Sequence, residues 1–241
     1  MKKRTVQTLV LAMSTCWAVA SHAAEWSYTG EHGAEHWGDT FATCGEGMNQ
    51  TPIDVTNAIK AELVPLHIDY QGSIKEIINN GHTIQANITG DNTLTVDDEQ
   101  FELKQFHFHT PSENYINGKQ YPLEAHFVHA NQQGQLAVLA VMFNTGPRAN
   151  DQLNILLETI PKKDTATQLT STFNPADLLP RDREYYRFNG SLTTPPCSEG
   201  VRWFMMKDHQ SGSEKQVGSL HDVMGDNARP LQSLNARVIL E

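Results

Sequence analysis

Two short segments of this chain carry histidines in the alternating pattern of a β-strand. The first reads Gln-Phe-His-Phe-His and ends at His109. Because successive side chains of a strand point to opposite faces, Gln105, His107 and His109 share one face. Phe106 and Phe108 then pack on the other face. A fold of this chain therefore has to hold two histidines next to each other on one face of a sheet.

The second segment reads Leu-Glu-Ala-His-Phe-Val-His and puts Glu124, His126 and Val128 on one face. If this strand lies beside the first, His126 joins His107 and His109, and three imidazole nitrogens face one metal ion. Three protein ligands leave a tetrahedral ion one open position, which is typical of a catalytic zinc site. The alternative is a set of half-buried histidines in an ordinary sheet.

Polar neighbours favour the metal site over that alternative. Gln105 lies two residues before His107, and Glu124 lies two residues before His126. Metal-bound imidazoles usually donate their second N–H to such an acceptor, which fixes the tautomer and the ring orientation. In an ordinary core the same Gln and Glu would be buried polar groups without partners. We therefore interpret the cluster as a site.

Residues 1–23 are predicted to be a cleaved signal peptide. A basic start, Lys2 to Arg4, is followed by an apolar stretch and by small residues that end at Ala23, the order that a signal peptidase reads. Cleavage is expected after Ala23, with Ala20 as the competing site. The apolar stretch is short for a bilayer span, so a membrane anchor is the weaker alternative. The expected location is the periplasm or the cell exterior, with no membrane association after processing.

Charge excludes one class of partner. The formal net charge is −10 at pH 7, and removal of the three basic residues of the signal peptide changes it to −13. Such a chain repels phosphate groups, so nucleic acid is not an expected partner. An acidic excess of this size is a common basis of solubility, and we attach no partner to it.

Cysteine usage favours one disulfide. Cys16 leaves with the signal peptide, and Cys44 and Cys197 remain. An even number of cysteines in an exported chain is typical of disulfide pairing, while two free thiols are the alternative. A bridge between them would close a loop of about 150 residues and stabilise the fold by restricting the unfolded chain.

Residues 24–241 contain no repeat or linker and are interpreted as one domain. Strand signals dominate, and residues 25–56 are expected to form an irregular arm that packs over the body. A nearly continuous apolar run at residues 136–143 predicts a central strand. The expected strands are residues 66–70, 74–79, 82–88, 93–96, 101–109, 123–130, 136–143, 185–188 and 201–206, with a last one at 238–240.

Helix signals are few. Leucines at helical spacing begin at Asp151 and end before Pro161, and residues 175–179 fit a single turn. Ser213 can cap a helix that runs to about residue 224, with Gln216 at the capping-box position. The predicted fold is mainly β, a single domain built on a large, mostly antiparallel sheet with a few short peripheral helices.

Three further motifs place polar residues near this sheet. Ser-Leu-Thr-Thr-Pro-Pro-Cys contains Thr193 and Thr194 in a backbone that prolines stiffen. Asn-Asn-Gly-His is a turn signal that delivers His82 to the start of a strand. Pro-Ser-Glu-Asn follows the first histidine strand and puts Glu113 near its end. Taken singly, these are a fixed loop, a hairpin with an exposed histidine and a solvated acid.

The combination resembles the α-class carbonic anhydrases, from about Trp26 to the C-terminus. The two histidine segments, the Thr-Thr-Pro-Pro loop and the Asn-Asn-Gly-His turn stand here in the order of that family. The resemblance implies a twisted, mainly antiparallel sheet with a conical cavity that holds Zn²⁺. The short loops are similar to those of the bacterial secreted or periplasmic branch.

The resemblance implies a role for each site residue. His107, His109 and His126 correspond to the zinc ligands, with Gln105 and Glu124 as the acceptors behind them. Thr193 and Glu113 correspond to the pair that orients zinc-bound hydroxide. The positions that contact carbon dioxide or bicarbonate are Thr194 and the apolar residues Val128, Val138, Leu192 and Trp203.

Other correspondences concern the proton path and the covalent framework. His82 matches the proton shuttle, and Tyr28, Asn80 and Gln85 match a polar wall that holds a chain of waters. Cys44 and Cys197 match the disulfide of secreted members. The chain departs from animal members in two places: Thr-Pro-Ser replaces a longer loop before Glu113, and Asn114 stands where they have a histidine.

The expected activity is the reversible, zinc-dependent hydration of carbon dioxide to bicarbonate and a proton, by attack of zinc-bound hydroxide. The alternatives are a catalytically silent binding protein on the same fold and a zinc esterase. A silent relative should lack a ligand histidine, and an esterase should need a larger pocket. The resemblance also implies inhibition by anions and sulfonamides and a monomer or homodimer.

Overall fold

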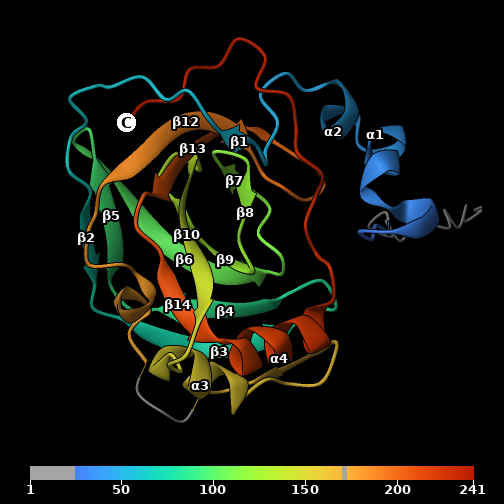
Figure 1. Ribbon diagram of the computed structural model, residues 1–241, viewed down its shortest axis with the longest axis vertical. Coiled ribbons are helices and arrows are strands. Elements are labelled where there is room, and N and C mark those ends of the chain that lie inside the picture. Colours follow the sequence, from blue (N-terminus) through green and yellow to red (C-terminus); the bar gives the residue numbers. More distant parts are fainter. Residues whose placement is uncertain (1–24, 170–172) are drawn as a thin grey trace, which may run out of the picture.

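The structure is a computed structural model that describes residues 25–169 and 173–241 (Figure 1). The predicted signal peptide, residues 1–23, lies outside the described residues. Within the described ranges, no helix combines the length and the apolar character that a membrane span requires.

A large β-sheet runs through the molecule, which confirms the predicted mainly-β class. Its strands within the described residues are β2 (His67–Tyr70), β3 (Ser73–Asn79), β4 (Ile84–Thr89), β5 (Asn92–Val96), β6 (Glu99–His109), β9 (Leu123–Ala130), β10 (Leu136–Gly146), β11 (Thr165–Thr167), β12 (Tyr185–Ser191), β13 (Glu199–Met206) and β14 (Gln210–Ser213). Eight of them lie in the order β11-β3-β4-β6-β9-β10-β13-β12, and β2, β5 and β14 pair at the side of this row. A separate small sheet is formed by β1 (Asp54–Val55), β7 (Tyr115–Ile116) and β8 (Lys119–Gln120).

The sheet is mostly antiparallel, as predicted, with an exception at its centre. β10 pairs antiparallel with β9 but parallel with both β13 and β14. The apolar run in β10 fits this position, because residues 137–143 are buried on both faces. The apolar pattern therefore predicted the central strand, but it carried no information on the direction of its neighbours.

One face of the sheet bears a large apolar core. Phe106 and Phe108 are buried on this face, as predicted, with their rings 5.8 Å apart. Phe106 also packs against Phe127 of β9 at 5.3 Å and against Phe173 at 5.7 Å. Burying these rings removes several hundred Å² of apolar surface from water and stabilises the sheet by several kcal/mol per ring at about 25 cal/mol per Å². The histidines of β6 are thereby presented on the opposite face.

Two helices cover the edge of this core (Figure 1). α3 (Asp151–Leu157) begins where the Asn150 side chain accepts hydrogen bonds from two helical N–H groups. α4 (Glu214–Met224) has the predicted capping box, in which Ser213 and Gln216 each bond the backbone N–H of the other. Gly225 ends α4 with a φ of +66°, a conformation that favours glycine. A 3₁₀ turn, η3 (Pro175–Leu178), stands at the predicted position.

The N-terminal arm differs from the irregular segment that was predicted. It contains short helical turns, η1 (Gly30–His32), η2 (Ala34–His36), α1 (Trp37–Thr40) and α2 (Ala42–Glu46), which lie beside the body in Figure 1. Trp37 is buried against Trp26 and Tyr28 and donates a hydrogen bond to the Ser27 carbonyl. Each turn is short, so packing of the aromatic side chains is what stabilises it.

Most predicted strand boundaries differ from the structure by about one to three residues, and two differences stand out. β4 starts at Ile84 instead of residue 82, because the Asn80 side chain accepts hydrogen bonds from the N–H groups of His82 and Thr83 and holds them in a turn. The predicted strand at 238–240 is reduced to bridges from Leu240 to Ile59 and Arg187.

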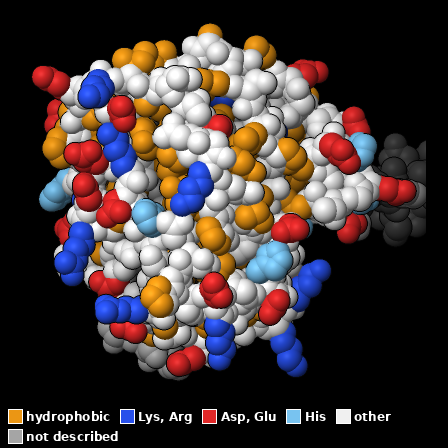
Figure 2. All heavy atoms as spheres, viewed as in Figure 1, with side chains coloured by type: hydrophobic (Ala, Val, Ile, Leu, Met, Phe, Trp, Pro, Cys, Tyr) orange, Lys and Arg blue, Asp and Glu red, His pale blue; other side chains and the backbone are white. Residues whose placement is uncertain are grey.

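Charged side chains are mixed over the surface that Figure 2 shows. Acidic and basic groups alternate there, with hydrophobic side chains between them. Figure 2 therefore shows no single basic face, in keeping with the formal net charge of −10. The expectation that nucleic acid is not a partner stays a prediction.

The predicted disulfide is present between Cys44 of α2 and Cys197. Both residues are buried and pack with Trp37, so the bridge ties the N-terminal arm to the loop before β13. The two cysteines are 153 residues apart in the sequence.

Reducing this disulfide is expected to lower the melting temperature by roughly 5–15 °C. The reason is that a bridge across a long loop contributes about 2–5 kcal/mol, and 1 kcal/mol shifts the melting temperature of a chain of this size by about 2–4 °C. Thermal unfolding with and without reductant, and of the Cys44→Ser/Cys197→Ser variant, measures the effect. Two titratable thiols in the untreated, oxidised protein would contradict the pairing.

Candidate metal centre

Strand register brings the three predicted histidines together. In the antiparallel pairing of β6 with β9, His107 lies directly opposite His126, and His109 lies opposite Glu124. One ring nitrogen of each histidine lies within 4.8 Å of one nitrogen of each of the other two. Among the described residues, this is the one group of three or more His, Cys, Asp or Glu side chains with that geometry.

The second nitrogen of each ring faces a hydrogen-bond acceptor. His107 donates from Nδ1 to Oε1 of Gln105 at 2.9 Å, and His109 donates from Nδ1 to the Asn227 carbonyl at 2.8 Å. Nε2 of His126 lies 2.8 Å from Oε1 of Glu124, although the two groups lack the alignment of an ideal hydrogen bond. These acceptors carry no proton to donate, so each fixes the tautomer of its histidine. The nitrogens left without a proton are Nε2 of His107, Nε2 of His109 and Nδ1 of His126, which we call the bare nitrogens.

The bare nitrogens fit a metal ion. Nε2 of His109 is buried without a hydrogen-bond partner, and 3.4 Å from it lies Oε2 of Glu113, also buried without a partner. Such atoms are costly in a protein interior unless a missing group satisfies them. Burial lowers the pKa of His107 and of His109, so both rings stay neutral and keep a lone pair for a ligand. Three imidazole nitrogens are a donor set typical of zinc.

Glu113 lies beside this cluster. It follows β6 after the cis peptide bond between Thr110 and Pro111, and its Oε1 accepts a hydrogen bond from the Arg229 N–H at 2.9 Å. Burial raises the pKa of the Glu113 carboxyl to about 7, against the lowering effects of His126, the Arg229 N–H and the Thr193 hydroxyl. The structure thus places Thr193 next to the buried carboxyl, as the resemblance implied.

The Thr193 loop is held in place by β12 and the disulfide. The Leu192 N–H donates to the Ser198 carbonyl, and the Cys197 N–H donates to the Thr194 carbonyl at 2.9 Å. Pro195 and Pro196 are joined by a cis peptide bond inside this turn. The short loop is therefore closed by its own hydrogen bonds, and Thr193 is buried in it.

Three of the predicted apolar positions form one row across the sheet. Val128 of β9 pairs with Val138 of β10, and Val138 pairs with Trp203 of β13. The ring of Trp203 stands edge-on to that of His126, with centroids 5.0 Å apart. Leu192 packs against the same cluster. The structure thus brings an apolar surface up to the bare nitrogens.

The polar residues that were predicted to hold a chain of waters lie on the side of the histidines away from the apolar row. Gln85 of β4 pairs with His107 of β6 and donates a hydrogen bond to Asn87. Tyr28 lies close to Glu113, and burial, with the charge of that carboxyl, raises the pKa of its phenol. Asn80 is exposed in the turn before His82.

His82 is stacked on Trp26, with ring centroids 3.9 Å apart and planes 13° from parallel. Burial, and then the nearby Lys163, lower the pKa of the His82 imidazole, while Asp164 raises it. Its carbonyl accepts a hydrogen bond from the Asn227 side chain. Because the carbonyl of Asn227 also holds His109, one buried residue links the His82 backbone to the metal centre.

Two contributors to the site were missed in the sequence. Asn227 and Arg229 follow α4, far along the chain from the histidine segments, yet one supports His109 and the other supports Glu113. Both act on these two side chains through backbone groups, a carbonyl and an N–H, which every residue type except proline offers. The polar loop after the Gly225 cap was the only local signal, and it did not indicate a partner.

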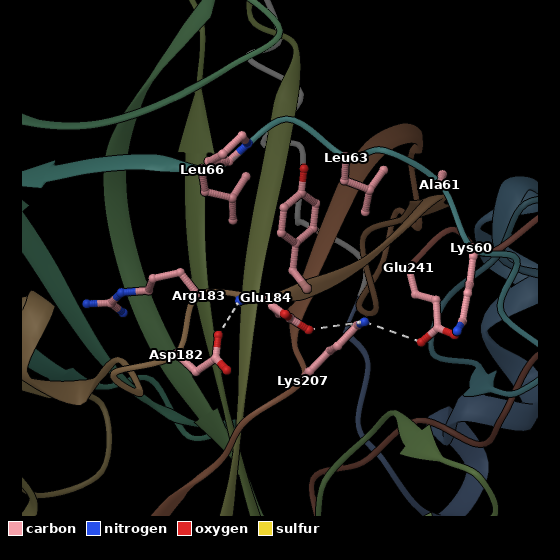
Figure 3. A pocket seen from close by; sticks show the side chains of 11 residues that line it. Lys60, Ala61, Leu63, Leu66, Asp182, Arg183, Glu184, Lys207 and Glu241 are labelled. Carbon is pink, nitrogen blue, oxygen red and sulfur yellow. Dashed lines mark hydrogen bonds and ion pairs between the residues drawn. The ribbon is translucent and has the colours of Figure 1, made fainter.

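A separate cavity of about 760 Å³ lies elsewhere, between residues 60–66 and the start of β12 (Figure 3). Lys207 crosses its floor and reaches Glu184 at 3.5 Å and Glu241 at 3.3 Å. Lys207 offsets part of the negative charge of the two carboxylates, and none of the predicted site residues lines the cavity. The ion pair with Lys207 holds the Glu241 side chain at the edge of this cavity.

Fold and site together define a class: a β-sheet protein with a three-histidine cluster that could hold a metal ion, beside an apolar wall and a hydroxyl–carboxylate pair. Comparisons with known proteins agree. The family profile of eukaryotic-type carbonic anhydrases matches residues 32–241. A carbonic anhydrase of Pectobacterium atrosepticum is 44% identical over 239 residues, covering 97% of this chain and 98% of the relative.

Solved structures extend the comparison. An α-carbonic anhydrase of Photobacterium profundum is 70% identical with a TM-score of 0.89, covering 90% of this chain and all of the other. That of Thermovibrio ammonificans, solved with the inhibitor sulfanilamide, is 45% identical with a TM-score of 0.89, over 91% of this chain and all of the other. The chain therefore belongs to the α-class, eukaryotic-type carbonic anhydrases, and is an enzyme of that family.

Proposed function

We propose that this enzyme catalyses the reversible hydration of carbon dioxide, in which carbon dioxide and water give bicarbonate and a proton, with Zn²⁺ as its cofactor. The observation that carries the proposal is the convergence of three imidazole nitrogens next to an unpartnered carboxylate oxygen and an apolar wall. His107, His109 and His126 would hold the ion. When bound, zinc acidifies a water molecule at its open position and so supplies a hydroxide nucleophile near neutral pH.

Thr193 and Glu113 are proposed to orient the nucleophile. The Glu113 carboxylate accepts from the Arg229 N–H and has its second oxygen directed at the histidines. A Thr193 hydroxyl that donates to this carboxylate has only lone pairs left to offer. Thr193 would therefore accept a hydrogen bond from the nucleophile at this site and orient it toward the substrate. Thr194, one residue further on, is proposed to contact substrate and bicarbonate.

The apolar row is proposed to receive carbon dioxide. Val128, Val138 and Trp203 lie in register on the face that bears the histidines, and Leu192 adjoins them. Carbon dioxide is apolar, so it needs a dry surface rather than hydrogen-bond donors. A wall with two valines and a leucine encloses a small molecule better than an ester, which argues against a dedicated esterase.

Proton release is proposed to run along the polar side, past Tyr28, Asn80 and Gln85, to His82. An imidazole can accept and release a proton near neutral pH. The stacking of His82 on Trp26 keeps the ring beside the arm, within 6.5 Å of the Tyr28 ring.

His82→Ala is expected to slow carbon dioxide hydration roughly tenfold or more in weak buffer, because general acid–base groups contribute at least this much. Added imidazole should restore the rate, since it replaces the missing proton acceptor. His67→Ala, which removes an exposed histidine of β2, is the matched control and should leave the rate unchanged. An unaltered rate in His82→Ala would show that protons leave by another path.

We also propose export to the periplasm or the cell exterior, on the basis of residues 1–23 and of the disulfide between Cys44 and Cys197. Sulfonamide binding is proposed from the relative solved with sulfanilamide. Oligomeric state is proposed to be a monomer or a homodimer.

Stopped-flow measurement of carbon dioxide hydration by the purified protein tests the proposed function. The expected result is hydration well above the buffer background, abolished by a sulfonamide and accompanied only by slow ester hydrolysis. A zinc-loaded protein that leaves the hydration rate at the background would contradict the proposal and favour a silent binding protein. Faster turnover of esters than of carbon dioxide would favour the esterase.

A further inference from the structure

We infer that Asn114 is a positioning residue for the metal centre: its side-chain amide holds Glu124 so that Glu124 fixes the tautomer and direction of His126. The inference rests on the proposed zinc site and deepens it. Asn114 touches neither substrate nor the bare nitrogens, and it acts through two other side chains.

Glu124 is fully buried, and its carboxylate is surrounded by donors. Oε2 accepts from the backbone N–H groups of Glu113 at 2.8 Å and Asn114 at 2.9 Å. Oε1 accepts from Nδ2 of Asn114 at 2.8 Å and lies 2.8 Å from Nε2 of His126. A buried carboxylate is tolerated only when its oxygens are paired in this way.

Apart from His126, the Asn114 side chain is the donor that the described residues direct at Oε1 of Glu124. The backbone N–H groups of Glu113 and Asn114 both donate to Oε2 of Glu124. They fix the position of that oxygen but leave Oε1 free to rotate about it. Nδ2 of Asn114 removes that freedom. Oε1 is then directed at Nε2 of His126, which must carry the proton, and Nδ1 is left bare toward His107 and His109.

The amide itself cannot reverse its direction. Oδ1 of Asn114 accepts from the Ile53 N–H at 3.0 Å, next to the cis peptide bond between Thr51 and Pro52. A flipped amide would place Oδ1 against the acceptor Oε1 of Glu124 and the NH₂ group against the donor N–H of Ile53. The carbonyl of Asn114 accepts from the Ser112 hydroxyl, and the residue is fully buried. The Ile53 N–H therefore fixes the orientation of the Asn114 amide, and the amide in turn fixes the Glu124 carboxylate that faces His126.

This arrangement gives a consequence for zinc retention. Residues that hold a metal ligand from behind contribute about 10- to 100-fold to metal affinity. Asn114→Ala removes the Oε1 donor and leaves both backbone donors on Oε2. Zinc release to an excess of chelator is expected to become at least about tenfold faster than in the unaltered enzyme.

Asn92 provides a matched control in the same chain. It is also a fully buried asparagine, at the start of β5, and its side chain accepts from the Gly72 N–H and donates to the Thr89 and Gly90 carbonyls. Asn92→Ala is expected to lower stability by a comparable amount and to leave the zinc release rate within twofold of the unaltered enzyme. A merely structural role for Asn114 would make the two variants release zinc alike.

A second measurement needs no variant. In the enzyme labelled with ¹⁵N at asparagine, removal of zinc should shift the side-chain amide signal of Asn114, because the Glu124–His126 link relaxes, and should leave that of Asn92 in place. The inference would be overturned if Asn114→Ala released zinc at the rate of the unaltered enzyme, or if both variants released zinc at the same rate. It would also be overturned if the Asn114 amide signal did not shift when zinc is removed. An unaltered enzyme that binds no zinc would instead refute the proposed function, so the two failures are distinguishable.

Discussion

His126→Ala is expected to abolish zinc binding and carbon dioxide hydration together. The structure places one ring nitrogen of His126 in the group of three that lie within 4.8 Å of one another. Losing a group that only supports a ligand weakens metal binding by about 10- to 100-fold, so losing the ligand itself should exceed about 100-fold. Zinc content after dialysis and stopped-flow hydration measure both effects.

His129→Ala is the matched control for that prediction. His129 lies three residues further along β9, on the opposite face, where its Nε2 is 2.7 Å from the Tyr70 hydroxyl. Burial lowers the pKa of His129 to about 4, so it is a neutral core residue. Its loss should cost about 2–4 kcal/mol of stability by opening a cavity and leaving the Tyr70 hydroxyl unpaired. Folded His129→Ala should still bind one zinc ion per chain and hydrate carbon dioxide.

Thr193→Ala is expected to separate catalysis from metal binding. This variant removes the hydroxyl that neighbours Glu113 but leaves all three histidines and their acceptors in place. Removing one oriented hydrogen-bonding group from a reaction centre costs about 100-fold or more in rate. Hydration kcat/KM should therefore fall about 100-fold, while zinc content stays at one ion per chain.

Thr159→Ala controls for the loss of a threonine hydroxyl. The Thr159 side chain donates to the Ile155 carbonyl after α3, away from the metal centre, and its loss should not change hydration. A Thr193→Ala variant with the full hydration rate would remove the hydroxyl–carboxylate pair from the mechanism. A variant that lost zinc as well would show that Thr193 acts on the structure of the site instead.

Much of the site could be predicted because strands have a simple side-chain period. Alternation alone put His107 and His109 on one face and the phenylalanines on the other, and the register of β6 and β9 then brought His126 opposite His107. Helix α4 could be predicted for a similar reason, because the two residues of its capping box lie close together in the sequence. Residue types with a short-range signature were thus placed correctly.

Features that depend on distant backbone groups could not be predicted. Asn227 and Arg229 reach His109 and Glu113 through a carbonyl and an N–H, so their side-chain types carry no signal of those contacts. The parallel pairing of β10 with β13 was also hidden, because a buried strand has the same apolar pattern in either direction. The helical turns of the arm arise from packing of Trp37 and not from a periodic pattern.

Zinc titration of the metal-free enzyme tests the central claim most directly. The account predicts that carbon dioxide hydration is absent from the metal-free enzyme, returns in proportion to added zinc and saturates at one ion per chain, since three histidines form a single site. Full hydration by metal-free enzyme would contradict it. So would a chain that binds one zinc ion at these histidines and leaves the hydration rate at the buffer background.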